Sequence, residues 1–324
     1  MRKIFTLLLA AALVVTLFAG CKKTTAEPSA SPSAPVSEEP TAPETPADTK
    51  ISLTDPLGVT VTLDKPAEKV VALTASDAEI VYALGAGSTL VGRGEYCDYP
   101  AEIFEVQVVN SGNDTNVEQI IALKPDLVLM ATMAQSAEQS AQLLAAGIQV
   151  YTSDSKTIDE TYNVIGQIGT LLGKDAEAKA VVDGMKADFA ELSKNKLEGT
   201  VYFEVSPLEW GLWTAGSGTF MQEVADLIGL TNIFADVDGY AEVSEEQVLA
   251  RNPDYILTVG MYFGEGLKPD EEIYSRANWQ KIAAVKNKGI ANIDDNSLSR
   301  PGPRLAQGAK ALYDFIKNAA NAAQ

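Results

Sequence analysis

The side chains in this sequence that could bind or transform a ligand are aromatic and polar groups gathered in a few short stretches. Residues 95–100 read EYCDYP, residues 209–218 read EWGLWTAGSG, and residues 300–304 read RPGPR. The first two stretches are expected in loops directly after β-strands, with Tyr240 in a further Gly-containing loop. Because ligands of α/β proteins bind beyond the carboxyl ends of strands, these loops predict a binding pocket.

The aromatic residues in these stretches differ in how well a pocket explains them. Tyr96 and Trp213 are predicted to line a pocket, since an aromatic side chain in a loop offers a ligand both apolar area and a polar group. For Trp210 and Tyr240, a pocket and ordinary packing remain equally open. Packing is expected of two other side chains, Trp279 and Cys97.

Catalytic motifs are missing from the sequence. It contains no His, which excludes His-containing zinc sites, Ser-His-Asp and Cys-His pairs and axial His ligation of haem. It has no GxSxG stretch, no GxGxxG after a predicted strand and no Walker A lysine. With 44 acidic and 25 basic residues, the chain repels nucleic acid, and most of its carboxylates are expected to be solvated. We therefore expect a binding protein without a cofactor or metal rather than an enzyme.

The N-terminus has the features of a bacterial lipoprotein signal over residues 1–21. A basic start is followed by an apolar run at 4–17, which is shorter than the roughly 20 residues of a transmembrane helix. Small residues then lead into Cys21, and the chain turns polar directly after it. An ordinary secretory signal with a chance Cys is the alternative. The lipoprotein interpretation predicts a lipid on Cys21 and a protein held on the extracytoplasmic face of the bacterial cell membrane by that lipid alone.

Residues 22–50 are predicted to form a disordered tether. They are rich in Pro, Ala, Ser, Thr and Glu and have almost no large apolar side chain, so they cannot bury enough surface to offset the entropy of ordering. Past the signal, Cys97 is the one remaining cysteine, so no intramolecular disulfide is expected.

The folded part alternates strand and helix patterns, which predicts the α/β class. One α/β lobe is expected at 51–157 and a second at 200–324, with a helical connector at 158–199 whose long helix over 175–197 joins the lobes. Strands are expected at 59–63, 69–73, 89–92, 126–130, 148–151, 200–205, 255–259 and 289–293, and helices at 75–84, 117–123, 134–146, 158–172, 175–197, 217–228, 245–251 and 305–317.

Two stretches, one in each lobe, nearly repeat one another. Residues 118–129 read EQIIALKPDLVL, and residues 246–257 read EQVLARNPDYIL. Each predicts a short helix, a Pro-Asp turn and a buried strand, because Pro ends a helix and the apolar run that follows fits a sheet core. The leading Glu118 and Glu246 would lie in the first helical turn, where capping and the helix dipole suffice to explain them. The expected N-cap residues are Asn116 and Ser244, with Gln119 and Gln247 completing capping boxes.

The order of these pieces resembles the extracytoplasmic substrate-binding proteins of ABC importers for iron-siderophores, haem and vitamin B12. The resemblance covers nearly all of 51–324, and its pieces are residues 69–100, 116–129, 158–197, 216–234, 242–257 and 299–304. It implies two α/β lobes joined by one rigid helix, with a ligand cleft between the lobes.

Within this family, the stretch Tyr96-Cys97-Asp98-Tyr99-Pro100 is most similar to the vitamin B12-binding members. Trp213 and Tyr240 fall where those members place cleft aromatics. Three positions depart from the B12 pattern: about Gly112 and Ala131, which are Trp in the well-known B12 binder, and Asn296, which is a cleft Asp. The ligand-binding residues that the resemblance implies, together with the aromatic stretches, are Tyr96, Asp98, Tyr99, Trp210, Trp213, Tyr240, Asn296 and Arg300.

A corrinoid is therefore the expected ligand, with two alternatives in the same importer family. A ferric siderophore calls for basic residues, for which Arg93, Arg300 and Arg304 are the candidates. Haem would need a ligand such as Tyr96 or Met133. An alternative of another class is a surface sensor lipoprotein without a transport role.

The resemblance also gives the repeated glutamates a second role. In this family each lobe presents an exposed Glu that docks on arginines of the membrane permease dimer, and the matching positions here are Glu118 and Glu246. The expected partners are thus a permease dimer and a small-molecule ligand, and the protein itself is expected to be a monomer that does not bind nucleic acid.

Overall fold

The computed structural model describes residues 50–322, except 113, 207, 260–265 and 294–295. The chain divides into two units, Met1–Ala47 and Asp48–Gln324, and all described residues belong to the second. The predicted signal at 1–21 with its Cys21, and the tether at 22–50 apart from Lys50, lie outside the described residues. Within the described part, no helix is both long and apolar enough to cross a membrane.

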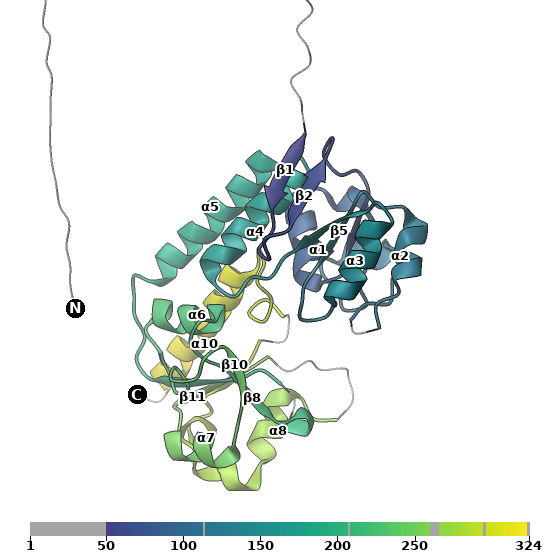
Figure 1. The fold of residues 1–324 in the computed structure, drawn as a ribbon. Helices are drawn as coiled ribbons and strands as arrows, with labels where there is room; N and C mark the ends of the chain where they lie inside the picture. Colours follow the sequence, from purple (N-terminus) through teal and green to yellow (C-terminus); the bar gives the residue numbers. More distant parts are fainter. Residues whose placement is uncertain (1–49, 113, 207, 260–265, 294–295, 323–324) are drawn as a thin grey trace, which may run out of the picture. The chain divides into compact units, whose positions relative to one another are not determined.

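The first lobe, as far as the structure describes it, is built on a parallel sheet with the strand order β4-β3-β5-β6, next to an antiparallel β1-β2 hairpin (Figure 1). Its strands are β1 (Ile51–Thr54), β2 (Thr60–Leu63), β3 (Val70–Ala72), β4 (Leu90–Arg93), β5 (Leu127–Met130) and β6 (Gln149–Thr152). Its helices are α1 (Ala75–Ala83), η1 (Gly87–Thr89), η2 (Ala101–Glu105), α2 (Val117–Leu123) and α3 (Ala137–Ala145). All residues of β3 and β5 are buried, as expected where helices cover both faces of a parallel sheet.

The second lobe has a mixed sheet with the order β10-β8-β7-β11-β12 and β9 paired to β7. β7, β11 and β12 run parallel to one another, whereas β8 is antiparallel to both of its neighbours, β7 and β10. The strands that the structure describes here are β7 (Thr200–Glu204), β8 (Leu212–Ala215), β9 (Thr231–Asn232), β10 (Tyr240–Val243), β11 (Tyr255–Thr258) and β12 (Ile290–Asn292). The helices are η3 (Leu208–Trp210), α6 (Phe220–Ile228), α7 (Glu245–Arg251), α8 (Pro269–Ser275), η4 (Ala277–Lys281) and α9 (Ala283–Lys286).

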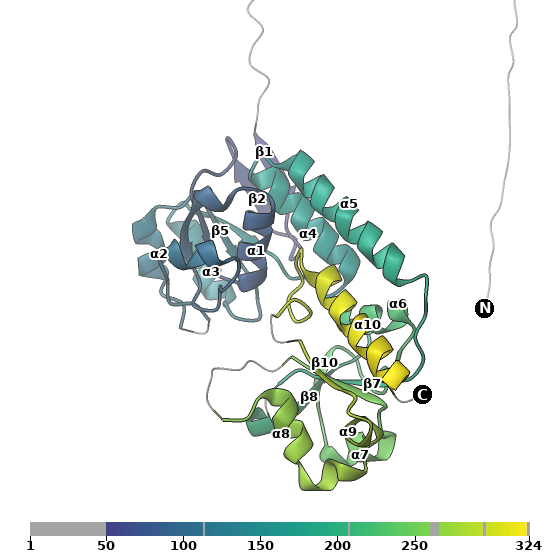
Figure 2. The ribbon, with the colours of Figure 1, turned by 180° about the vertical axis from the view of Figure 1, so that it is seen from behind.

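Three helices connect the lobes. α4 (Ile158–Leu171) packs on α5 (Asp175–Leu192), and the last helix, α10 (Leu305–Ala322), packs on α5 as well (Figures 1 and 2). One buried apolar cluster contains residues of both sheets and of all three helices, so the lobes share a core around α5. The predicted α/β fold of two lobes joined by a long helix is confirmed.

The long helix ends five residues before its predicted end at 197. After Ser193 the chain turns to meet the end of α6, where the Leu197 N–H donates to the Ile228 oxygen at 2.7 Å. Lys196 Nζ also donates to the oxygens of Asp226 and Leu227. The last carbonyl groups of α6 have no partner within that helix, so they accept these bonds, and residues 196 and 197 do not continue α5.

Two predicted loops are strands instead. Trp213 and Tyr240 were predicted in loops, but Trp213 lies on β8 and Tyr240 on β10. Glycines around these short segments suggested turns, whereas antiparallel pairing of β8 with β10 supplies each strand with hydrogen-bond partners that no local pattern shows.

The repeated joints form equivalent structures in the two lobes. Asp126 Oδ2 accepts hydrogen bonds from the backbone N–H groups of Glu68 and Lys69, at the start of β3, both at 2.9 Å. Asp254 Oδ2 accepts from the N–H and hydroxyl of Thr200, the first residue of β7, at 2.9 and 2.8 Å. Each Asp therefore ties its own strand to the central strand beside it.

The predicted capping of the repeat is confirmed for α7 and partly for α2. Ser244 and Gln247 form a complete capping box. Asn116 caps α2 by accepting from the Gln119 N–H at 3.0 Å, but the Gln119 side chain does not return to the N-cap. It bonds the Asn110 N–H and the Val108 oxygen, because the preceding segment runs beside the helix start.

Candidate functional site

The predicted binding aromatics are exposed, in contrast to the aromatic residues of the cores. Exposed fractions are 57% for Tyr96, 45% for Tyr99, 67% for Trp210, 38% for Trp213 and 44% for Tyr240. The expected packing of Trp279 and Cys97 is confirmed, since each is 1% exposed. Because large apolar side chains are rarely left in water in such numbers without a role, the exposed set indicates a binding surface.

In the second lobe, the β8–β10 pair orders two of these aromatics on one face. Trp213 lies opposite Glu242 and Tyr240 opposite Ala215, so Trp213 and Tyr240 are diagonal neighbours. On the opposite face of the same strand pair, Leu212 and Val243 are buried. Strand alternation therefore places both rings on the face opposite Leu212 and Val243.

In the first lobe, a hollow of about 440 Å³ lies where the loops after β4 and β5 meet the segment before α2. The site is beyond the carboxyl ends of parallel strands, as the sequence analysis expected. Tyr96 and Met133 both line it, and Met133 is 93% exposed. Its lining residues are Glu95, Tyr96, Asn110, Ser111, Gly112, Asp114, Met133 and Ala134.

Three predicted residues, Asp98, Asn296 and Arg300, meet in one charged cluster. Arg300 Nη1 lies 2.5 Å from Asp98 Oδ1, and Nη2 lies 3.1 Å from Asp98 Oδ2. Asn296 Nδ2 donates to Asp98 Oδ2 at 3.4 Å. Asp98 and Arg300 therefore form a bidentate ion pair between segments about 200 residues apart in the chain.

The sequence analysis did not single out Glu79, which completes this cluster. Its Oε1 accepts from Arg300 at 2.9 Å and from Arg304 at 2.8 Å, and its Oε2 accepts from Arg304 Nε at 2.9 Å. Glu79 is 3% exposed, against the expectation that carboxylates are solvated. A charged residue directly before the apolar pair Ile80-Val81 was the available signal, since a charge on a buried helix face needs a partner.

The arginines considered for a ferric siderophore are occupied by the protein's own acceptors. Arg93 is 6% exposed, and its Nη1 donates to the oxygens of Gly94 and Cys97. The Arg304 guanidinium lies 3.9 Å from the centre of the Tyr99 ring in addition to its bonds with Glu79. Although burial alone would lower the pKa of Arg300, hydrogen bonds to Asp98 and Glu79 raise it, so the guanidinium stays charged.

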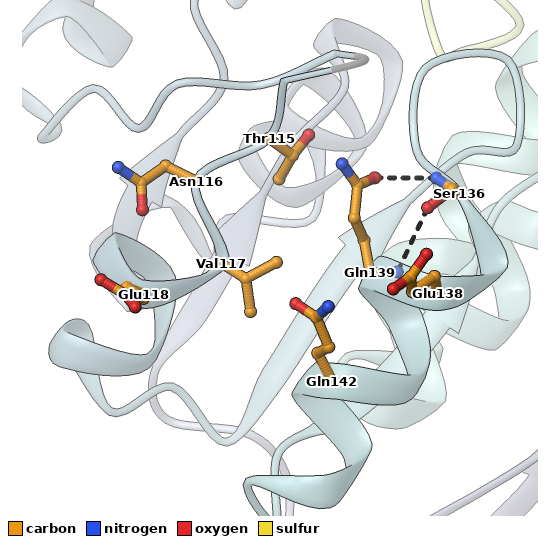
Figure 3. Close-up of a pocket in the computed structure, with 8 residues that line it drawn as sticks. All are labelled: Thr115, Asn116, Val117, Glu118, Ser136, Glu138, Gln139 and Gln142. Atoms are coloured by element: carbon orange, nitrogen blue, oxygen red, sulfur yellow. Dashed lines mark hydrogen bonds between the residues drawn. The ribbon is translucent and has the colours of Figure 1, made fainter.

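A second hollow, of about 460 Å³, lies between the N-termini of α2 and α3. Figure 3 shows Glu118 and Glu138 on its two sides, with the Ser136–Gln139 capping bonds of α3 beside them. Glu118 is exposed, and so is Glu246 at the equivalent start of α7. Hydrogen bonds from its own backbone N–H and from Ser244 lower the pKa of Glu246, which favours its ionised form.

Two further observations concern the free thiol and the acidic side chains of the described residues. Burial raises the pKa of the Cys97 thiol to about 12, so it stays protonated. Among the residues that the structure describes, no group of three or more Cys, Asp and Glu residues is arranged to hold a metal ion.

Known proteins resemble this chain over most of its length. The family described as periplasmic binding protein matches residues 70–297. YvrC of Bacillus subtilis, an uncharacterized ABC transporter substrate-binding lipoprotein, is 36% identical over 276 residues, which cover 82% of this chain and 85% of YvrC.

Two solved structures share the fold. The vitamin B12-binding protein BtuF of Vibrio cholerae has 27% identity and a TM-score of 0.65, covering 79% of this chain and 98% of BtuF. A possible iron-binding, solute-binding protein of Staphylococcus epidermidis has 32% identity and a TM-score of 0.65, covering 78% of this chain and 99% of that protein. The chain therefore belongs to the periplasmic binding protein family, the substrate-binding components of ABC importers.

Proposed function

We propose that this protein binds a corrinoid between its two lobes and delivers it to the permease of an ABC importer. The observation that carries this proposal is the exposure of aromatic side chains on both lobes, with Tyr96 and Tyr99 on the first and Trp210, Trp213 and Tyr240 on the second. A corrinoid is large, flat and partly apolar, so it would cover these rings on both of its faces.

The arrangement of charge supports a corrinoid over a ferric siderophore. Arg300 and Arg304 are balanced by Asp98 and Glu79 within one cluster, and Arg93 is buried among backbone carbonyls. A negatively charged chelate would have to break these pairs, and breaking a buried pair costs about 3–5 kcal/mol. A corrinoid with amide side chains makes no such demand.

Haem is the second candidate, because one observation favours it. Tyr96 and Met133 line the same hollow in the first lobe, and a phenolate or thioether can ligate haem iron. In a corrinoid complex the same two side chains would supply apolar contact and a hydroxyl.

Titration of the purified protein with cyanocobalamin, haemin and several ferric siderophores tests the ligand. Trp210 and Trp213 are exposed at the proposed site, so their fluorescence should be quenched saturably by cyanocobalamin at micromolar concentrations. N-acetyl-tryptophanamide in the same solutions corrects for light absorbed by the ligand. Saturable quenching by haemin or a siderophore, with none by cyanocobalamin, would overturn the proposed ligand.

Attachment to the membrane through Cys21 is part of the proposal. The motif at residues 1–21 and the description of YvrC as a lipoprotein support it. With Cys21→Ser, the protein should move from the membrane fraction to the soluble extracytoplasmic or culture fraction, while its ligand binding stays unchanged. Retention in the membrane fraction would show that Cys21 is not the anchor.

A further inference from the structure

The charged cluster around Arg300 joins the last loop of the chain to the loop that carries Tyr96. We call its four ionised residues, Glu79, Asp98, Arg300 and Arg304, the clasp. Glu79 comes from α1 and Asp98 from the loop after β4, while both arginines lie in the segment directly before α10. The clasp therefore links two segments of the first lobe, which follow β3 and β4, to the segment between β12 and α10.

The terminal nitrogens of Arg300 donate to acceptors within the protein itself. Nη1 has acceptors in Glu79 and Asp98, and Nη2 has acceptors in Asp98 and in the Tyr96 carbonyl at 3.3 Å. Its side chain is 12% exposed, compared with 46% for Asp98. A guanidinium whose two terminal nitrogens are already saturated is poorly placed to bind a ligand as well.

Glu79 fixes the position from which Arg300 acts. The Glu79 side chain is 2% exposed and accepts from both arginines, which holds the two guanidinium groups in one place. The N–H groups of Arg304 bond Glu79, and the flat face of its guanidinium lies over the Tyr99 ring. The buried Glu79 thus holds both arginines in position, and the arginines in turn contact residues 96–99.

We propose that Arg300 is a positioning residue: the clasp holds Tyr96 and Tyr99 in their binding geometry, and Arg300 acts on the ligand through this loop. The proposal rests on the proposed binding site and reassigns Arg300 and Asp98 from ligand contact to support. Without the clasp, the exposed loop at 95–100 would have to be ordered when the ligand binds, and that ordering lowers affinity.

A double-mutant cycle with cyanocobalamin separates support from contact. Asp98→Ala and Arg300→Ala should each weaken binding about tenfold, and the double variant should be no weaker than either single variant. Arg300→Lys keeps the charge but cannot form the bidentate pair, so it should behave as Arg300→Ala. Additive losses, or near-normal binding by Arg300→Lys, would show that Arg300 contacts the ligand directly and would overturn the proposal.

A second measurement needs no ligand and therefore stands apart from the proposed function. Amide hydrogen exchange in a peptide covering residues 94–100 of the ligand-free protein should become faster in Asp98→Ala and in Arg300→Ala. If the wild type fails to bind cyanocobalamin while this exchange still responds, the ligand assignment fails and the clasp remains. Unchanged exchange in both variants would overturn the clasp.

The Arg251–Asp236 pair of the second lobe is a matched control. It is also bidentate, its arginine also donates to a backbone carbonyl, that of Ile233, and the guanidinium lies 4.4 Å from the Phe234 ring centre. Asp236→Ala and Arg251→Ala should leave cyanocobalamin affinity and exchange at 94–100 unchanged. A loss of affinity equal to that of the clasp variants would reveal a general effect of removing surface charge, and the proposal would fail.

Discussion

Trp213 is one of two exposed indoles in the second lobe. It is 38% exposed on β8, and Tyr240 on β10 is its diagonal neighbour. Trp213→Ala should weaken corrinoid binding by about 1–2 kcal/mol, roughly tenfold, because it removes a large apolar surface and its stacking. Trp213→Phe should retain most of the affinity.

Equilibrium dialysis with cyanocobalamin followed by absorbance measures this loss without relying on the removed fluorophore. Leu144→Ala, which removes an apolar side chain that is 40% exposed on α3, serves as the control and should bind as the wild type. Equal binding by the Trp213→Ala variant would remove Trp213 from the site.

Asp77 makes stability depend on pH. Burial raises the pKa of this fully buried carboxyl from its usual 3.8 to about 7, although hydrogen bonds from Ser153 and Thr74 oppose the shift. The folded state then binds the proton more tightly than the unfolded state, so the stabilising contribution is complete below pH 4 and is lost as pH rises to about 7. Asp77→Asn should therefore gain stability relative to the wild type across this window, on the order of 4 kcal/mol at most.

Urea unfolding at pH 5 and pH 8 tests the Asp77 prediction. Asp236→Asn provides a control: the hydrogen bond from Arg251 lowers the pKa of Asp236, so this carboxyl is ionised at both pH values and the effect of its loss should not differ between them. An advantage of Asp77→Asn that is the same at both pH values would contradict the prediction.

At this scale, the sequence was informative about which side chains are exposed and less so about which charges are buried. Exposure of Tyr96 and Trp213 could be predicted because aromatics among Gly and polar residues rarely belong to a core. The partners of Glu79 could not be predicted, because Arg300 and Arg304 lie 221 and 225 residues later in the chain. Only the folded topology brings those charges together.

The two Pro-Asp joints are structural elements with equal tasks. Asp126 and Asp254 each accept two hydrogen bonds at the start of the neighbouring central strand. Asp126→Ala and Asp254→Ala should each lower the free energy of unfolding by about 1–2 kcal/mol, because strand-start donors lose their acceptor. The losses should add in the double variant, since the joints lie in separate lobes.

Chemical denaturation measures these losses, and cyanocobalamin affinity should stay unchanged in both variants. Asp183→Ala, which removes an exposed carboxylate on α5, is the control and should stay within about 0.5 kcal/mol of the wild type. No loss of stability in either joint variant would mean that the turns are held by their Pro residues alone.

Elements with a strong local pattern could be predicted closely, and elements that depend on pairing could not. α2 and α7 have the predicted bounds, because an N-cap residue starts each helix and a residue before Pro ends it. β8 and β10 were missed, since each has only four residues and gains its strand form from the other. The end of α5 was also misplaced because its competitor, the open end of α6, is distant in sequence.

At the scale of the whole described part, the protein consists of two related lobes with a limited symmetry. The parallel sets β3-β5-β6 and β7-β11-β12 correspond, and in both the strand after the repeated helix pairs with the central strand. The correspondence ends at the sheet edges, where β4 is parallel to β3 but β8 is antiparallel to β7. The strands that the two lobes share position α2 and α7. The exposed aromatics lie at the edges where the lobes differ, after β4 in the first lobe and on or beside β8 in the second.

Glu118 and Glu246 occupy equivalent points of this symmetry, at the first turns of α2 and α7. We expect them to dock on the permease dimer of the proposed importer, because two equivalent carboxylates would match two symmetry-related basic sites. Glu118→Ala with Glu246→Ala should lower corrinoid uptake by cells several-fold or more while leaving cyanocobalamin affinity unchanged, because both side chains are exposed at helix starts and neither belongs to the proposed aromatic site. Each single variant should fall between the double variant and the wild type.

Uptake of labelled cobalamin in cells that depend on this protein measures the effect, with binding measured on the purified variants. Glu177→Ala with Glu191→Ala is the matched control, since it removes two exposed carboxylates from α5 with the same change in net charge. Normal uptake by the Glu118 and Glu246 double variant would favour a surface protein without a transport role. Reduced uptake in the control as well would instead point to net charge, because the loss would then follow the number of carboxylates and not their position at the two helix starts.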